Sequence, residues 1–350
     1  MIAEIRLQNF RSYSDNTFMF KPGVNIIVGP NTSGKTNLLE AILVVSSGQS
    51  YRAKDQQLIS RNKEWSRIDC LLTDQTSRTV KLFIDITPNK KYEINKKPIK
   101  RLTITNTLPL VLFEPEHLLL LSGRPELRRE YLDGLLEKTV IGYSKLRRQY
   151  KRAVSQRNVL LKNEHQKHKE IFPWNIRISE LGGQIMRLRS NLVLHINDNL
   201  NVLYREISKS KTDVKFMYQS KWDSSSYESQ LLKELESSIS FDRVRGYTSA
   251  GPHREDVLAT FDDKPSQNTA SRGEIRTLIL ALKILELKII EEARGVAPML
   301  LLDDVFSELD AKRRKALTEH LSSYQSFITT TDADLVLQNF AKTNNIITLK

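Results

Sequence analysis

The sequence is poor in cysteine and has no long apolar run. Its 350 residues include one cysteine, Cys70, which excludes an internal disulfide framework and any zinc site built from several cysteines. No run approaches the roughly 18 apolar residues that a membrane-spanning helix needs. The opening segment MIAEIRLQNF carries an acidic residue where a secretory signal would carry its basic and apolar regions. We therefore expect a cytoplasmic protein that does not enter membranes.

Acidic residues are also outnumbered: 41 Asp and Glu stand against 54 Lys and Arg, a formal net charge of +13. The basic excess is concentrated in RPELRREY at 124–131 and KLRRQYKRAVSQRN at 145–158. A basic protein without a membrane segment most often meets nucleic acid, because neutralising phosphates releases counterions. A solubilising surface and contact with an anionic membrane are the alternatives that charge alone leaves open.

The apolar pattern divides the chain into three parts. Residues 1–124 read as an α/β region, with strand-length apolar runs broken by turn residues. Across 125–240 Gly and Pro become scarce, and Leu and Ile recur at three-to-four spacing, which predicts a helical lobe. Strand signals return across 241–350, first in FDRVRGYTSAGPH and DVLATFDD. The outer parts are therefore expected to form one α/β nucleotide-binding head around an inserted helical lobe.

The helical lobe is expected to contain several helices rather than one long coiled coil. Proline and glycine are poor helix formers, and the lobe contains Pro173 and the pair Gly182-Gly183. These positions predict interruptions and a helical hairpin bundle of modest reach.

The strongest local signal is VNIIVGPNTSGKTN at 24–37, which fits the phosphate-loop pattern GxxxxGKT between a predicted strand and a predicted helix. Backbone N–H groups are expected to converge on phosphate oxygens, Lys35 to reach the β- and γ-phosphates, and the Thr36 hydroxyl to ligate Mg²⁺. An ordinary glycine turn is the alternative. The predicted nucleotide-binding residues here are Gly29, Pro30, Asn31, Thr32, Ser33, Gly34, Lys35, Thr36 and Asn37.

A second signal is PMLLLDD at 298–304, where an apolar run meets two adjacent aspartates. Such a run reads as a buried parallel strand, and its end would place Asp303 opposite the phosphate loop as a Mg²⁺ ligand. Asp304 is the candidate for orienting or deprotonating the attacking water, and with Lys35 it makes up the predicted catalytic pair. Because the usual ending of such a strand is Asp-Glu and aspartate is shorter, we predict slow hydrolysis.

Three further segments decide the class of phosphate-loop protein. ASRGEIRTLILALKI at 270–284 places Ser271 and Gly273 at the start of a long helix, where a serine N-cap leaves amide donors for an anion. A plain capped helix is the alternative. SELD at 307–310 follows the Asp-Asp strand, and FITTTD at 327–332 is a strand that ends in hydroxyl residues. In this order the set resembles the ABC-type ATPases, and the chain has no NKxD-type guanine signature.

Within that superfamily the chain resembles the bacterial RecF family of DNA replication and repair proteins. LQNFRSY, NLLEAI, FEPEHLLLLSGRPELRREYLD, YTSAGPHRED and LLLDDVFSELD carry the resemblance, which runs along the whole chain. The helical lobe is too short for the coiled coils of SMC-type relatives. The resemblance implies an ABC-ATPase head, with a mixed sheet plus a parallel core, and a helical second lobe.

The resemblance also implies a mechanism. ATP and Mg²⁺ would be bound at a phosphate loop that the signature segment of another monomer closes, with Ser271 and Gly273 contacting the γ-phosphate across an ATP-dependent homodimer. The family implies ATP-dependent binding to DNA, weak DNA-dependent ATPase activity, and help in placing recombinase on gapped DNA, where single strands join duplex, with RecO and RecR as partners. The net basic charge agrees with DNA as a partner.

Several positions depart from the ABC pattern. The switch strand offers threonines where many ABC ATPases have histidine, which predicts a hydroxyl γ-phosphate sensor at Thr330 and low turnover. Glu114 and Glu116 are alternative positions for the Q-loop residue.

Two further segments have open interpretations. Arg11 in NFRSY is interpreted either as approaching the nucleotide or as a surface arginine. His253 and Arg254 in GPHRED are either structural turn residues or contacts to nucleotide or DNA.

Three rival functions fit parts of the sequence. A nuclease of the overcoming-lysogenization type would need a second acidic metal cluster, for which the segment after 332 leaves no room. An ABC transporter subunit predicts a glutamate after Asp303, a histidine switch and no basic excess. A DNA-bound dimer without turnover remains open.

Overall fold

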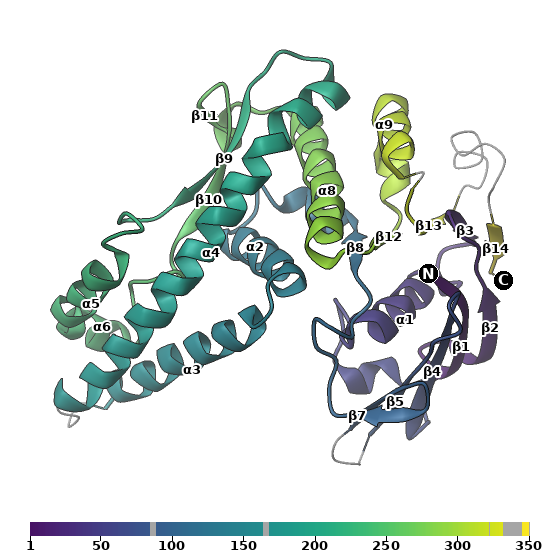
Figure 1. Ribbon diagram of the computed structural model, residues 1–350, viewed down its shortest axis with the longest axis horizontal. Coiled ribbons are helices and arrows are strands. Elements are labelled where there is room, and N and C mark those ends of the chain that lie inside the picture. The colour runs from purple at the N-terminus through teal and green to yellow at the C-terminus, as the bar shows by residue number, and fades with distance from the viewer. Residues whose placement is uncertain (85–88, 164–167, 322, 332–344, 350) are drawn as a thin grey trace. The chain divides into compact units, whose positions relative to one another are not determined.

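The computed structural model describes residues 1–84, 89–163, 168–321, 323–331 and 345–349. The chain forms two compact units, one made of Met1–Leu118 with Ile279–Lys350 and the other of Leu119–Leu278. Both ends of the chain thus belong to the first unit, and the second unit is a continuous insertion. Figure 1 shows the elements of each unit with their labels.

The first unit contains a five-stranded parallel sheet with the order β14-β3-β13-β12-β8. Val28 lies beside Thr330, and Leu302 lies beside Phe113, so that the carboxyl ends of the strands meet at one edge. Ligands of open α/β sheets bind outside this edge. The strands are β3 (Val24–Val28), β8 (Leu110–Phe113), β12 (Met299–Leu302), β13 (Ser326–Thr330) and β14 (Asn345–Thr348).

A six-stranded antiparallel sheet with the order β2-β1-β4-β5-β6-β7 completes the core of this unit. Helix α1 (Lys35–Ser47) packs against β13 and also against β1, β4 and β5 (Figure 1). Every residue from Leu38 to Ser46 is therefore buried, which explains why the helix is apolar on nearly all sides. The strands are β1 (Ile2–Phe10), β2 (Tyr13–Met19), β4 (Trp65–Leu72), β5 (Ser77–Phe83), β6 (Lys90–Ile94) and β7 (Lys97–Ile99).

The remaining elements of this unit are short. They are helix α9 (Ala311–Leu321) and the 3₁₀ turns Asp55–Leu58, Pro115–Leu119, which straddles the boundary between the units, and Val305–Glu308. The predicted α/β head with a parallel core is confirmed.

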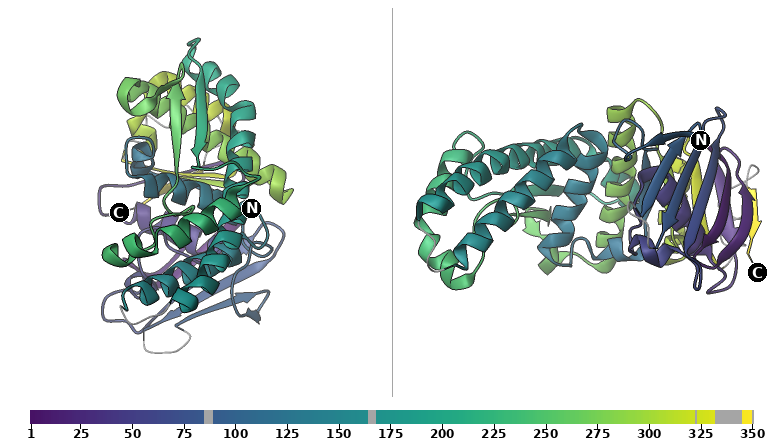
Figure 2. Two further views of the ribbon diagram at one scale, coloured as in Figure 1. Left: turned by 90° about the vertical axis from the view of Figure 1, so that its left-hand side faces the viewer. Right: turned by 90° about the horizontal axis from the view of Figure 1, so that it is seen from below.

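The second unit is mainly helical and includes a small sheet with the order β11-β10-β9. Its two longest helices, α3 and α4, lie side by side (Figure 2). Helix α8 (Arg272–Arg294) begins in this unit and continues into the first. The other elements are α2 (Pro125–Thr139), α3 (Tyr143–Leu161), α4 (His168–Ser208), β9 (Val214–Gln219), α5 (Tyr227–Ser237), α6 (Ile239–Arg245), β10 (Asp256–Phe261), β11 (Lys264–Pro265) and α7 (Ser266–Thr269).

Helix α4 corrects one prediction, because it runs for 41 residues without interruption. Pro173 lies near the N-terminal end of this helix, and the glycines serve close packing rather than a break. A Cβ on Gly182 would lie 3.0 Å from Leu231 Cδ2, and one on Gly183 would lie 2.4 Å from Glu228 Cγ, both on α5. Neither α4 nor any other described helix has the length and apolar composition needed to cross a membrane.

The boundary predicted at residue 240 is also wrong, because the second unit extends to Leu278. The reason is strand pairing: β10 adds antiparallel to β9, with Leu258 opposite Met217. Ser271 and Gly273 therefore belong to the second unit and not to the head. The first predicted strand after 240 is instead the helix α6, which ends at Gly246 with φ 73°. Short apolar runs of this kind fit either a helix or a strand.

Candidate functional site

The phosphate-loop segment folds tightly between β3 and α1. Gly34 has φ 101°, and a Cβ there would lie 2.8 Å from the Tyr13 hydroxyl, which donates a hydrogen bond to the Gly34 carbonyl at 3.0 Å. A Cβ on Gly29 would lie 2.5 Å from Ser33 Oγ and 2.9 Å from the Leu349 carbonyl oxygen. Both positions require glycine because the backbone approaches its neighbours so closely. The glycine pattern therefore has a steric cause.

The inner part of the loop is polar and suited to an anion. Lys35 is buried, and its Nζ donates to the carbonyl oxygens of Gly29 at 2.9 Å and Pro30 at 3.1 Å. The Ser33 hydroxyl is buried and has no hydrogen-bond partner among the described residues. No side chain caps the N-terminus of α1. A buried cation, an orphaned hydroxyl and an uncapped helix start are groups that phosphate oxygens would satisfy.

The outer residues of the predicted loop have other surroundings. Pro30, Asn31 and Thr32 are exposed, and Thr32 has φ 74°. Asn37, on the first turn of α1, donates to Ser12 Oγ at 3.0 Å and accepts from Arg52 at 2.8 Å. The Asn37 side chain is therefore held by protein groups.

Asp303 follows β12 and is 7 % exposed. Its Oδ1 accepts hydrogen bonds from Thr36 Oγ1 at 3.0 Å and Thr329 Oγ1 at 2.9 Å, and its Oδ2 accepts one from the Tyr51 hydroxyl at 3.0 Å. These three partners are neutral hydroxyl groups. A nearly buried carboxylate beside a threonine hydroxyl fits a hard divalent cation such as Mg²⁺. The two predicted metal ligands, Thr36 and Asp303, are thus in contact although they are 267 residues apart in the sequence.

Asp304 has a left-handed backbone conformation, which is uncommon for residues other than glycine. Its φ is 51°, and its N–H donates to Thr329 Oγ1 at 2.9 Å. Burial raises the pKa of its carboxyl, the Lys35 cation opposes this shift, and the nearby Asp303 charge adds to it. A carboxyl with a raised pKa is better suited to accept a proton than an ordinary aspartate.

The threonine strand β13 contributes a second hydroxyl group to this site. Thr329, rather than Thr330, bonds to Asp303 and Asp304, and its hydroxyl also donates to the Leu302 carbonyl at 3.3 Å. Side chains alternate along a strand, so Thr330 faces the opposite side of the sheet. The γ-phosphate contact of Thr330 stays a prediction.

Glu114 follows β8 at the same edge of the sheet as Asp303, whose N–H donates to the Phe113 carbonyl at 3.0 Å. Burial and the negative charges of Glu116 and Asp303 raise the pKa of Glu114 to about 7, although Lys283 and Arg52 oppose the shift. Glu116 itself is exposed. Glu114 is therefore the better placed of the two Q-loop candidates, and the role itself stays a prediction.

Two residues of this site were not predicted from the sequence. Tyr51 is one; nothing in its local sequence indicates that it contacts a residue 252 positions away. Glu40 is the other: it is fully buried on α1 and accepts hydrogen bonds from Arg11 at 2.8 and 3.0 Å and from Arg52 at 3.3 Å. Arg11 is thus not a plain surface arginine, because it pairs with Glu40, and its approach to a nucleotide stays a prediction.

In the second unit, Ser271 caps α8 as the sequence predicts. Its Oγ accepts from the Glu274 N–H at 3.3 Å, and its own N–H donates to Glu274 Oε2 at 2.8 Å, a reciprocal capping box. Ser271 is exposed, and Gly273 lies in the first turn of the helix. Their predicted contact with a γ-phosphate stays a prediction.

The GPHRED segment takes part in a buried polar network of the second unit. Tyr150 Oη lies 2.6 Å from His253 Nδ1, and burial lowers the pKa of His253 to about 4. Arg254 donates to the Thr248 carbonyl at 3.2 Å and stacks on the Tyr247 ring. These contacts support the structural interpretation of His253, and the Arg254 side chain remains exposed.

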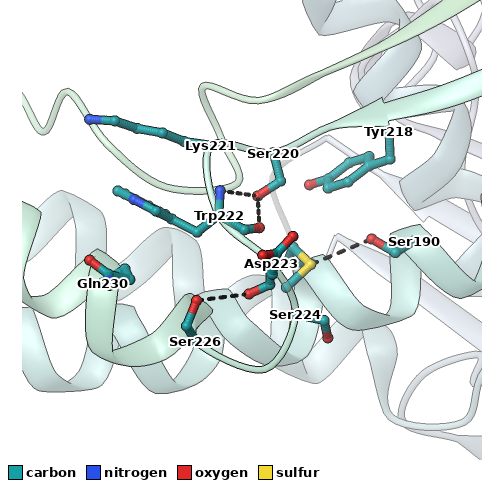
Figure 3. Close-up of a pocket in the computed structure, with 10 residues that line it drawn as sticks. Ser190, Tyr218, Ser220, Lys221, Trp222, Asp223, Ser224, Ser226 and Gln230 are labelled. Atoms are coloured by element: carbon teal, nitrogen blue, oxygen red, sulfur yellow. Dashed lines mark hydrogen bonds between the residues drawn. The ribbon is translucent and has the colours of Figure 1, made fainter.

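The second unit also has a cavity of about 410 Å³, shown in Figure 3. Lys221, one of its lining residues, is paired with Glu234 at 2.9 Å. The Ser220 hydroxyl donates a hydrogen bond to the Trp222 carbonyl and accepts one from the Trp222 N–H. None of the predicted site residues lines it. The lining residues are Met186, Ser190, Tyr218, Ser220, Lys221, Trp222, Asp223, Ser224, Ser226 and Gln230.

A family model described as the RecF/RecN/SMC N terminal domain matches residues 1–349. The DNA replication and repair protein RecF of Alkaliphilus oremlandii is 31% identical over 340 residues, covering 95% of this chain and 93% of that protein. The protein of the same name from Acetivibrio thermocellus is 33% identical over 348 residues, covering 95% and 94%.

Solved structures of RecF proteins are also similar to this chain. A structure of the recombination mediator protein RecF-ATPrS in the RecFOR pathway has a TM-score of 0.89 and 30% identity, covering 100% of this chain and 97% of that chain. The corresponding RecF-ATP structure has a TM-score of 0.84 and 31% identity, covering 95% and 92%. An Smc head bound to the C-winged helix domain of ScpA has a TM-score of 0.56 at 16% identity, covering 99% and 94%, and shares the fold alone.

Proposed function

The chain belongs to the RecF/RecN/SMC N-terminal domain family, and on this premise we propose that it is an ATP-driven DNA-binding protein of replication and recombinational repair. The observation that carries the proposal is the contact between Thr36 of the phosphate loop and Asp303 of the opposite strand. It joins a phosphate-binding loop to a carboxylate that has no cationic partner among the described residues, which is the arrangement that a nucleoside triphosphate and its divalent cation need.

Different residues of the head would bind the phosphates, hold the metal ion and accept the proton of the attacking water. Loop amides after Gly29, with Lys35 and the Ser33 hydroxyl, would bind the phosphates, and Thr36 and Asp303 would hold Mg²⁺. Mg²⁺ supplies neutralisation of charge on the phosphate oxygens when bound. Asp304 would accept the proton of the attacking water. We propose weak, DNA-dependent hydrolysis, because aspartate reaches less far than glutamate and is fixed here by Thr329.

Assembly on DNA is the second half of the proposal. Ser271 and Gly273 would meet the γ-phosphate held by a second copy, so that ATP binding drives homodimerisation and hydrolysis releases it. The basic excess would then retain DNA at gaps where single strands join duplex. RecO- and RecR-type mediators are the proposed protein partners, which the RecFOR naming of similar structures supports. The cytoplasm is the proposed location.

Sedimentation with and without Mg-ATP and gapped duplex DNA tests this function. The wild-type protein should shift from monomer to dimer with Mg-ATP and should then bind DNA. Lys35→Ala should lose ATP binding and both later steps, whereas Ser271→Arg should keep ATP binding in the monomer and lose only dimerisation. A wild-type protein that stays monomeric and ignores DNA at saturating Mg-ATP would overturn the proposal.

A further inference from the structure

Helix α3 (Tyr143–Leu161) of the second unit contains basic residues and no acidic residue at all. The basic side chains divide into two sets with different surroundings. Arg147 and Arg157 point inward: Arg147 pairs with Asp133 at 2.9 Å and Glu137 at 3.1 Å, and Arg157 pairs with Asp242 at 2.6 Å. These two arginines are accounted for by the stability of the unit.

The outward set has no such partners. Lys145, Arg148 and Arg152 are exposed, and within the described part of the chain none of them makes a side-chain hydrogen bond or an ion pair. Lys151 is also exposed, and Glu130 lies 3.9 Å from it. Three cations of one helix are therefore left facing solvent.

Their spacing puts the three cations on one face. Positions 145, 148 and 152 are related as i, i+3 and i+7, which is one stripe of an α-helix about 10 Å long at 1.5 Å per residue. The exposed polar residues Ser155 and Gln156 continue along the same helix. We name Lys145, Arg148 and Arg152 the α3 stripe.

We propose that the α3 stripe binds the phosphate backbone of DNA. The argument rests on the proposed function above and names the surface of the second unit that would serve it. Evenly spaced, unpaired cations flanked by neutral hydrogen-bond donors are what a sequence-independent phosphate contact requires.

The surroundings favour DNA over other anionic partners. A membrane-bound helix would need an apolar face in contact with the bilayer, but the apolar face of α3 is buried, with Tyr143, Tyr150, Ala153 and Leu161 all inside the unit. Helix α5 shows the contrast, because it carries three glutamates, Glu228, Glu234 and Glu236, beside a single exposed cation, Lys233. An acidic protein segment is the alternative occupant, and the experiment separates it from DNA.

The test compares two triple variants of the full chain with matched charge. One is Lys145→Gln/Arg148→Gln/Arg152→Gln, and the control is Lys211→Gln/Lys233→Gln/Lys264→Gln, which removes three exposed cations of the same unit that lie off the stripe. Affinity for gapped duplex DNA would be measured by fluorescence anisotropy across a salt series with Mg-ATP. The slope of log K against log salt should become shallower by about 2.7 in the stripe variant, about 0.9 for each phosphate, and should change little in the control.

The outcomes distinguish this inference from the proposed function. Circular dichroism and ATP-dependent sedimentation should be unchanged in both variants, which shows that folding and dimerisation survive. A wild-type protein that never binds DNA would overturn the proposed function and the stripe together. Normal wild-type binding with equal slopes for the stripe variant and the control would overturn the stripe alone. Loss of binding to a polyglutamate peptide with an unchanged DNA slope would mean that the stripe meets an acidic protein, which also overturns the proposal.

Discussion

Both units bury carboxylates, but the partners of these carboxylates differ. In the second unit the two most deeply buried aspartates meet arginine: Asp133 pairs with Arg189 at 2.8 Å, and Asp242 pairs with Arg157 at 2.6 Å. Burial alone would raise the pKa of Asp133, but Arg189, Tyr143 and Arg147 together outweigh it and the pKa is lowered. In the first unit Asp303 is nearly as buried, and within the described part of the chain its carboxylate accepts hydrogen bonds from hydroxyl groups alone.

The partners of a buried carboxylate therefore distinguish a carboxylate that stabilises the fold from one that can bind a cation. A carboxylate that an arginine already neutralises has little left to offer a ligand, whereas one that only hydroxyls hold keeps its charge for an incoming cation. Glu40 shows that this is a property of the partners and not of the unit, because it lies in the first unit and is paired with Arg11 and Arg52. Breaking each type of partnership should therefore have opposite consequences.

The largest expected effect is the loss of an arginine. Arg157→Met should destabilise the protein by about 3–5 kcal/mol, because it leaves Asp242 buried without a counter-charge. Urea denaturation followed by circular dichroism would measure the loss. The double variant Arg157→Met/Asp242→Asn should recover much of it, and a loss below about 1 kcal/mol in the single variant would contradict the comparison.

Asp303→Asn should behave in the opposite way. Folding stability should be unchanged or slightly higher, because a buried charge without a cationic partner is removed, whereas Mg-ATP turnover should fall by about 100-fold or more. Steady-state phosphate release and thermal unfolding would be measured on the same samples. A variant that is both active and destabilised would show that Asp303 is structural.

Tyr51→Phe tests the hydroxyl contacts around that carboxylate. Removing the hydrogen bond to Asp303 Oδ2 should raise the Mg²⁺ concentration needed for half-maximal turnover by about tenfold, because the carboxylate is then less well oriented. A Mg²⁺ titration of ATP hydrolysis would measure the shift. Tyr92→Phe, which removes a hydroxyl that bonds to the Gly48 carbonyl at 3.2 Å, is the matched control and should leave the titration unchanged.

The smallest effect concerns Glu114, whose pKa of about 7 lies above its usual value of 4.5. A raised folded-state pKa means that the stabilisation from the protonated form is complete below pH 4.5 and is lost as the pH rises through 7. Glu114→Gln should therefore gain thermal stability over the wild type at about pH 8 and little at about pH 5. Equal Tm differences at both pH values would contradict the assigned cause.

Local sequence was sufficient wherever chemistry and spacing coincide. The phosphate loop, Asp303 with Thr36, and the capping role of Ser271 follow from short motifs, because glycine, lysine and hydroxyl residues have few alternative uses at those spacings. Local sequence did not predict the contacts that depend on packing between distant segments of the chain. The contact of Tyr51 with Asp303 joins segments far apart in the chain, and no local pattern records it.

Three misreadings have the same physical origin. Gly182 and Gly183 predict a helix break, but α5 packs so closely that any side chain there would collide. FDRVRGYTSAGPH at 241–253 predicts a strand, but its first residues belong to helix α6, whose Asp242 pairs with Arg157. The edge of the second unit was placed too early because the partner of β10 is β9, on the other side of α5 in the sequence.

Because Leu349 lies close to Gly29, the surroundings of the phosphate loop are completed only after residue 349 has been translated. Strand β14 pairs with β3, and the Leu349 N–H donates to the Val28 carbonyl at 2.8 Å, so a segment near the C-terminus borders the loop that follows β3. At about 5–20 residues per second, a ribosome would need tens of seconds to extend the chain from one partner to the other. During translation the nascent strand β3 therefore waits with one edge unpaired until the segment that includes Leu349 reaches Gly29.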